Sequence, residues 1–281
     1  MKNPWLFRLA ILVAVCALLL IAGGAMVGPG TQPTPQAIST HRIAATVVSL
    51  LALGLVLWLV FTDSRPQARR LGWLTLALAV LQDSVGHGAV LTKFPMTAGI
   101  AHALMAPLFF AAVVAIAVVT SPAWNRGHEQ VRDYGWPSMR SLAILTPILV
   151  MLQILLGACF RLKALTLLPH VLGAMFVALA ILMESIFVLQ QFPSHRALRP
   201  AAKTLLGIGF GQVFLGLTAL IMKSMADDTA TPVIITVAGH VTGGSLTLAT
   251  TIVLSILIRR NVQPRIKKEE DEEDLEAPAA S

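Results

Sequence analysis

The sequence predicts an all-α polytopic membrane protein with eight transmembrane helices, arranged as two pseudo-symmetric four-helix bundles. Three observations support this fold class: an apolar composition, long apolar segments that recur along the chain, and a pattern of polar residues that occurs twice. Hydrophobic residues make up 56% and charged residues 12% of the 281 residues, whereas soluble domains have about 25% charged residues. Such a composition excludes a soluble globular domain.

Eight apolar segments are each close to the length of about 20 residues that crosses a bilayer as a helix. Glycine and proline within them are tolerated, because neighbouring helices satisfy the freed backbone groups. The segments are Leu6–Val27, Ile38–Phe61, Leu71–Leu91, Met96–Thr120, Ser141–Phe160, Leu165–Gln190, Leu205–Met222 and Val233–Ile258.

The basic residues orient the chain in the membrane. Sixteen of the 21 lysines and arginines fall on one side of the predicted helices, and an excess of positive charge marks the cytoplasmic side. Both termini are therefore predicted to be cytoplasmic, in a multi-pass protein of the cell inner (cytoplasmic) membrane. Because the net charge of +7 is explained by this orientation, no nucleic-acid partner is predicted; the surroundings are membrane lipid.

The pattern of segments divides the chain into four parts. Residues 1–120 and 141–260 form the two predicted bundles, and residues 121–140 form a cytoplasmic linker. Residues 261–281 carry the acidic run Glu269–Asp274 and are predicted to be a disordered cytoplasmic tail, because such a segment cannot bury a core.

The polar residues within the apolar segments follow a repeat. The second, fourth, sixth and eighth segments each carry one histidine near their predicted outer end, namely His41, His102, His170 and His240. The third, fifth and seventh carry glutamine four residues before glycine, namely Gln82 and Gly86, Gln153 and Gly157, and Gln212 and Gly216. In the first segment Gly24 remains, and Leu20 stands at the glutamine position.

Paired histidines at one depth indicate axial ligation of haem iron, with His41 paired to His102 and His170 to His240. A single membrane histidine is more often a helix–helix hydrogen-bonding residue, but four at matching positions favour haem. Zinc and copper are disfavoured, because no carboxylate or thiolate accompanies a histidine at ligand spacing.

With these marks the sequence resembles the heme A synthase family of cytochrome oxidase assembly enzymes, over nearly all the chain from Arg8 to about Arg260. The resemblance rests on His41-Arg42, Ile100-Ala-His102, Gln153-Ile-Leu-Leu-Gly157-Ala with Arg161, Leu168-Pro-His170-Val, Gln212-Val-Phe-Leu-Gly216 and Gly239-His240. The histidine set is the specific part of this pattern, and each glutamine–glycine pair alone is weak.

The resemblance implies an oxidoreductase that oxidises the ring methyl of heme O to the formyl group of heme A. His170 and His240 would hold a permanent haem b, and His41 and His102 would hold the heme O substrate. Implied partners are a heme O synthase, oxidase subunits or a quinone. Three cations at the predicted outer helix ends are candidate contacts for haem propionates or, alternatively, interface anchors: Arg42, Arg161 and Lys163.

The sequence departs from the family pattern at a residue that bears on catalysis. The family typically carries a glutamate three residues before the first histidine, where this chain has Ile38, and its first outer loop is usually longer. Asp83, expected to be a buried acid, is the candidate replacement base or a structural polar residue. A non-catalytic bis-histidine di-haem protein for electron transfer or haem handling therefore remains the alternative function. A small-molecule transporter is disfavoured, because no pair of broken helices is predicted at the midplane.

Overall fold

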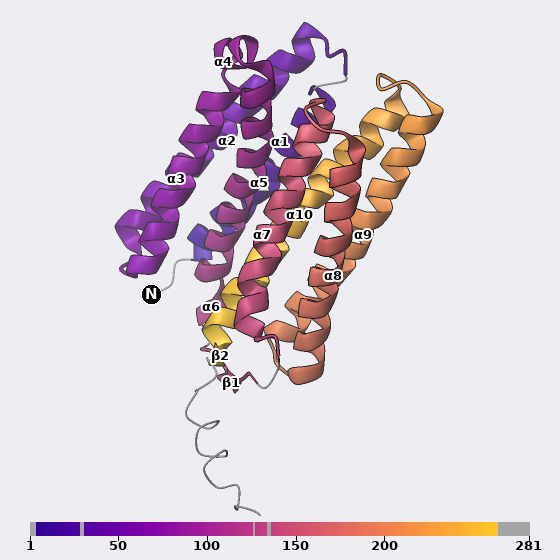
Figure 1. Ribbon diagram of the computed structural model, residues 1–281. Helices are drawn as coiled ribbons and strands as arrows, with labels where there is room; N and C mark the ends of the chain where they lie inside the picture. Colours follow the sequence, from indigo (N-terminus) through magenta and orange to yellow (C-terminus); the bar gives the residue numbers. More distant parts are fainter. Residues whose placement is uncertain (1–3, 29–30, 126, 134–135, 264–281) are drawn as a thin grey trace, which may run out of the picture.

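The computed structural model describes residues 4–28, 31–125, 127–133 and 136–263. The charged tail predicted for residues 261–281 lies outside the described residues from residue 264 onward. Figure 1 shows the elements, which in chain order are α1 (Pro4–Met26), α2 (Pro35–Thr62), α3 (Pro66–Gly86), α4 (Gly88–Lys93), α5 (Pro95–Thr120), α6 (Pro122–Asn125), β1 (Val131–Arg132), α7 (Met139–Arg161), α8 (Leu167–Gln191), α9 (Leu198–Met225), α10 (Thr231–Asn261) and β2 (Val262–Gln263).

Seven helices in the described part of the chain are long and apolar enough to cross a membrane, which confirms an all-α multi-pass membrane protein. They are α1, α2, α5, α7, α8, α9 and α10. The eighth expected span, Leu71–Leu91, is divided between α3 and α4, with His87 in an extended conformation between them. Only twelve residues separate Arg70 from Asp83 in α3, fewer than the roughly 20 that a span needs.

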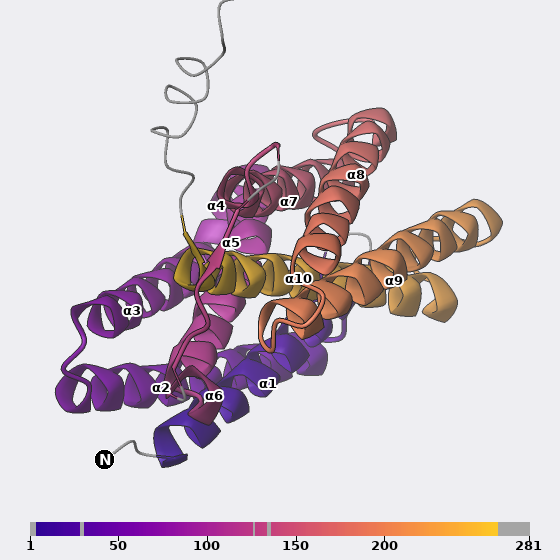
Figure 2. The same ribbon diagram turned by 90° about the horizontal axis from the view of Figure 1, so that it is seen from below.

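The helices contact one another in two groups of four. Within the first group the contacts run α1–α2, α2–α3, α3–α5 and α5–α1, and within the second α7–α8, α8–α9, α9–α10 and α10–α7. The two groups stand side by side in both views (Figures 1 and 2). They meet where α5 and α1 contact α10 and where α5 contacts α7. The pseudo-symmetry of the two groups stays a prediction.

The core lies where the two groups meet. Helices α5 and α10 are the most buried of the seven, and Ile116 of α5 and Leu248 and Leu254 of α10 are fully buried. Large apolar side chains on α8 and α9, such as Phe176 and Phe214, are instead exposed. A soluble protein would hide such residues, whereas lipid covers them at no cost.

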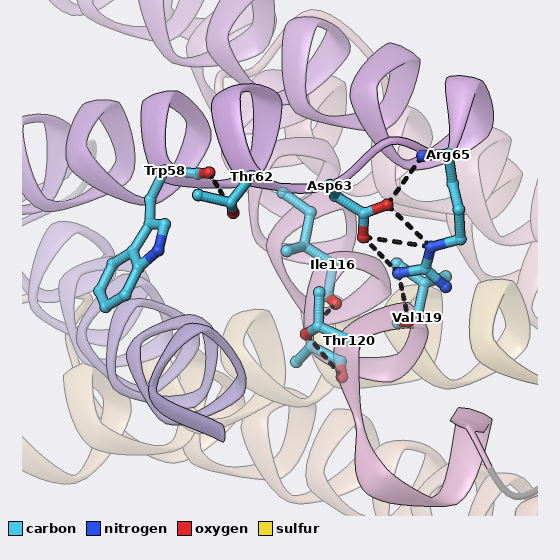
Figure 3. A network of polar contacts seen from close by, with 8 residues as sticks. Trp58, Thr62, Asp63, Arg65, Ile116, Val119 and Thr120 are labelled. Carbon is cyan, nitrogen blue, oxygen red and sulfur yellow. Dashed lines mark hydrogen bonds and ion pairs between the residues drawn. The ribbon is translucent and has the colours of Figure 1, made fainter. Parts of the chain in front are cut away.

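The lower ends of the helices in Figure 1 are tied together by polar contacts. Arg65, at the start of α3, donates to the carboxylate of Asp63 and to the carbonyl oxygen of Val119 at the end of α5 (Figure 3). The hydrogen bond from Arg65 holds the pKa of Asp63 below its usual value. The strands β1 and β2 pair in parallel, and Arg260 stacks on Trp124 at 3.7 Å from the ring centre. The segment predicted as a linker is therefore anchored to the end of α10.

Candidate functional site

Four histidines lie near one end of the molecule. Helices α2, α5, α8 and α10 begin at the end drawn uppermost in Figure 1, and each carries a histidine within its first ten residues. With a rise of about 1.5 Å per residue, the four side chains lie at similar depth. They are His41, His102, His170 and His240.

Each histidine packs against a glycine of the preceding long helix. A Cβ atom on the glycine would lie 2.8, 2.5, 2.9 and 2.8 Å from the histidine Cε1 atom, closer than Cβ atoms approach their neighbours. Larger residues at these positions would therefore displace the ring. The pairs, in the same order, are Gly24 with His41, Gly86 with His102, Gly157 with His170 and Gly216 with His240.

The three glutamines of the repeat contact the same histidine residues. Gln153 Nε2 donates to the backbone oxygen of His170 at 2.8 Å and lies 3.0 Å from its Nδ1 atom. Gln212 Nε2 donates to the backbone oxygen of His240 at 3.0 Å. Gln82 Nε2 lies 3.3 Å from the Nε2 atom of His102. The sequence repeat is thus a repeat of contacts.

The structure brings the C-terminal histidine pair together. The ring centres of His170 and His240 are 6.1 Å apart, with an angle of 88° between the ring planes. An imidazole nitrogen bonds a transition metal at about 2 Å and the ring centre lies roughly 1 Å behind it, so two axial imidazoles on one iron place their centres about 6 Å apart. The Nδ1 atom of His240 is buried and lacks a hydrogen-bond partner among the described residues. The pair therefore fits axial ligation of a haem iron.

The N-terminal pair lies on α2 and α5, which occupy opposite corners of the first helix group, as α8 and α10 do in the second. His41 and His102 are both half-buried. The Nδ1 atom of His41 is buried without a hydrogen-bond partner among the described residues. Ile38, one turn before His41, is half-buried; its side chain has no group that could transfer a proton.

The structure corrects the expected burial of Asp83, which is exposed. Its Oδ2 atom accepts a hydrogen bond from Ser49 Oγ of α2 at 2.8 Å. The preceding residue, Gln82, faces α5, and one residue along a helix turns the side chain by about 100°. Asp83 therefore points to the seam between α3 and α2, which its sequence position alone did not reveal.

The three candidate cations occupy two places at the histidine end. Arg42 packs against α4, where a Cβ atom on Gly88 would lie 2.7 Å from its Nη2 atom. Arg161 donates from Nη2 to the backbone oxygen of Ala25, 2.5 Å away, and so caps the last turn of α1. Arg161 and Lys163 also line a cavity of about 180 Å³.

Two residues that the sequence reasoning had not singled out also line this cavity. Lys223, at the end of α9, lies 2.5 Å from Asp228 in an ion pair. The opposite charges of Lys223 and Asp228, five residues apart across a helix end, could have indicated the ion pair. They do not indicate that residues of α1 and α7 line the opposite wall of the cavity.

Four further ionisable residues are not assigned to the histidine pairs. His87 and His128 are exposed. His195 is buried and accepts hydrogen bonds at Nδ1 from the backbone nitrogens of residues 197 and 198, both at 3.1 Å, which is a structural role. Glu184 is fully buried on α8, but it lies fourteen positions after His170, a rise of about 21 Å. Among the described residues no group of three or more His, Cys, Asp or Glu is arranged to hold a metal ion, so no such cluster competes with the histidine pairs.

The N-terminal part of the chain matches a known protein family. Residues 27–114 match the model of a family described as cytochrome oxidase assembly protein. The resemblance to the heme A synthase family is thereby confirmed over this segment, which contains His41, Asp83 and His102. His170 and His240 lie beyond the matched residues. A search of curated proteins found no match.

Proposed function

We propose, with this family match as the premise, that the chain is a membrane oxidoreductase of heme A biosynthesis, which oxidises the ring methyl of heme O to a formyl group during cytochrome oxidase assembly. The observation that carries the proposal is the fourfold contact between a histidine and a glycine of the preceding long helix. The contact of Gly86 with His102 lies inside the matched segment, and so does His41 of the first contact, whereas the two C-terminal contacts lie outside it. The C-terminal half therefore repeats the local geometry of the part that the family match covers.

The proposed roles of the histidines follow from this repeat. His170 and His240 hold haem b, which supplies one-electron transfer when bound. His41 and His102 would hold the substrate, heme O, in the first helix group. Conversion of the methyl to a formyl group would take its oxygen atom from water and release four protons and four electrons, which two molecules of a carrier such as a quinone would accept by way of the C-terminal half. Heme O synthase and oxidase subunits are the proposed partners for supply and delivery.

Cations at the same end fit the haem carboxylates. Arg42, Arg161 and Lys163 lie at the helix ends nearest the histidines, and a part-buried cation–carboxylate contact is strong. Arg161 would keep its bond to the backbone oxygen of Ala25, since a guanidinium has further donors.

In the proposed topology eight helices cross the inner membrane, as bundles of residues 1–120 and 141–260, with both termini cytoplasmic. The short apolar run of α3 makes its crossing of the membrane the part of this topology that most needs a test. A reporter placed at Thr92 in α4 should lie outside, one in the loop 226–230 should also lie outside, and one after Ser281 should lie in the cytoplasm. A cytoplasmic signal at Thr92 would show that α3 does not cross.

Asp83 is the proposed proton acceptor. Its carboxylate accepts a hydrogen bond from Ser49 Oγ of α2, the helix that carries His41. Asp83 is the acid of α3, the helix that contacts both α2 and α5, and this position supports the proposal. Proton removal from the methyl group needs such a base near the reacting carbon, and Ile38 does not provide one.

The enzyme proposal predicts heme A from the wild-type chain in a host that lacks its own synthase and is supplied with heme O. Asp83→Asn keeps the size and hydrogen bonding of the side chain but removes the base, so heme A should fall by at least about 100-fold with haem content unchanged. Extracted haems are separated by chromatography and identified by mass. Asp227→Asn, an exposed acid in the loop before α10, is the matched control and should leave heme A unchanged.

One observation favours a second function: Ile38 stands at the usual acid position, and the candidate replacement, Asp83, is exposed. In this alternative the chain is a di-haem protein that transfers electrons or handles haem without chemistry on the ring. A wild-type chain that carries haem but forms no heme A would select this function. Heme A formed equally by wild type and Asp83→Asn would instead retain the enzyme and reject Asp83 as its base.

A further inference from the structure

The four histidine sites differ in the side chains that hold the histidine helix. In all four the glycine of the preceding helix contacts the ring, which fixes the structural equivalence of Leu20 with Gln82, Gln153 and Gln212, each four residues before that glycine. Leu20 is thus the one member of this set without a side-chain amide. The contact between Gly24 and His41 shows that Leu20 occupies the position that glutamine has in the other three sites.

Each C-terminal site has a complete three-residue arrangement, which we call the glutamine brace. The amide of Gln153 donates to the backbone oxygen of His170, and the side chain of any residue larger than glycine at Gly173 would collide with that amide. Gln212, His240 and Gly243 repeat the arrangement. The second lone pair of a helical carbonyl is free to accept such a bond, so the brace fixes the rotation and height of the histidine helix.

The N-terminal sites lack this arrangement. Three residues after His102 stands Met105 instead of glycine, and the amide of Gln82 lies 3.3 Å from the ring nitrogen of His102. At His41 both parts are replaced, by Leu20 and Ala44.

We propose that the glutamine brace sets how firmly each half retains its haem, and that His41 is the ligand that detaches when haem leaves the N-terminal half. This inference rests on the proposed haem sites. It adds which residues make one site retain its haem permanently and let the other exchange it. Groups that orient a metal ligand typically change affinity by about 10–100-fold. An unbraced histidine also loses more side-chain and helix freedom when it binds.

The test measures haem loss from purified protein in detergent to an excess of an apoglobin, followed by absorbance. Each half is measured alone, the C-terminal half in His41→Ala and the N-terminal half in His170→Ala. We expect the N-terminal half to lose haem at least about 10-fold faster than the C-terminal half. Gln153→Leu should accelerate loss from the C-terminal half about 10-fold, with Gly207→Ala, at a glycine with open space around it, as the silent control.

A gain-of-function variant keeps the test independent of folding defects. Leu20→Gln combined with Ala44→Gly should install a brace at His41 and slow haem loss from the N-terminal half about 10-fold. The matched control is Leu19→Gln with Ala44→Gly, because Leu19 is 66% exposed and faces away from the bundle. The reduction potential of the braced site should also shift, which a purely structural role of the amide would not produce.

The outcomes separate this inference from the function on which it rests. A wild-type chain that binds no haem overturns both. If both halves bind haem but lose it at equal rates, or if the Leu20→Gln pair changes neither the rate nor the potential, the brace has no role in retention while the proposed haem sites stand.

Discussion

Replacing His170 or His240 by alanine is expected to remove the proposed haem b from the C-terminal half completely. The ring centres of these residues are 6.1 Å apart, the separation that two axial ligands of one iron require. Without one ligand, the six-coordinate low-spin spectrum of that half should disappear. The measurement is the absorption spectrum of purified protein together with its haem content per chain.

The control for this experiment is His87→Ala. His87 is exposed at the break between α3 and α4, so its loss should leave the spectrum and the haem content intact. A loss of haem in His87→Ala as complete as in His170→Ala would mean that the ligands are assigned wrongly.

Gly216→Val is expected to disrupt the same site by steric overlap. A Cβ atom on Gly216 would lie 2.8 Å from His240 Cε1, and valine adds two methyl groups beyond it. Either α9 and α10 separate or the His240 ring turns away, so haem binding should be lost. Overpacking of this kind costs about 1–3 kcal/mol, which should lower the thermal midpoint in detergent.

Gly207→Val on the same helix is the matched control. No atom lies within 4 Å of a Cβ atom on Gly207, so this variant should keep both its haem and its thermal midpoint. Equal haem content in Gly216→Val and wild type would show that the close glycine–histidine contact is not needed for the site.

The sequence by itself was sufficient for the membrane class and for most helices, because a bilayer accepts only long apolar segments with satisfied backbones. The depth of the four histidines was also readable, since it follows from their distance to the helix ends. α3 was the exception: the apolar pattern continued past Gly86, but the helix ends there and a short helix, α4, follows after His87.

Tertiary structure alone decided which residues meet. The sequence showed glutamine and glycine on one face of a helix, but only packing showed that Gly157 admits the ring of His170 and that Gly173 leaves room for the amide of Gln153. Packing likewise turned Asp83 to the surface beside Ser49 and directed Arg161 to the end of α1. The physical reason is that spacing along one helix fixes the relative direction of its own side chains, whereas contacts across the bundle depend on how each helix is rotated and shifted against its neighbours.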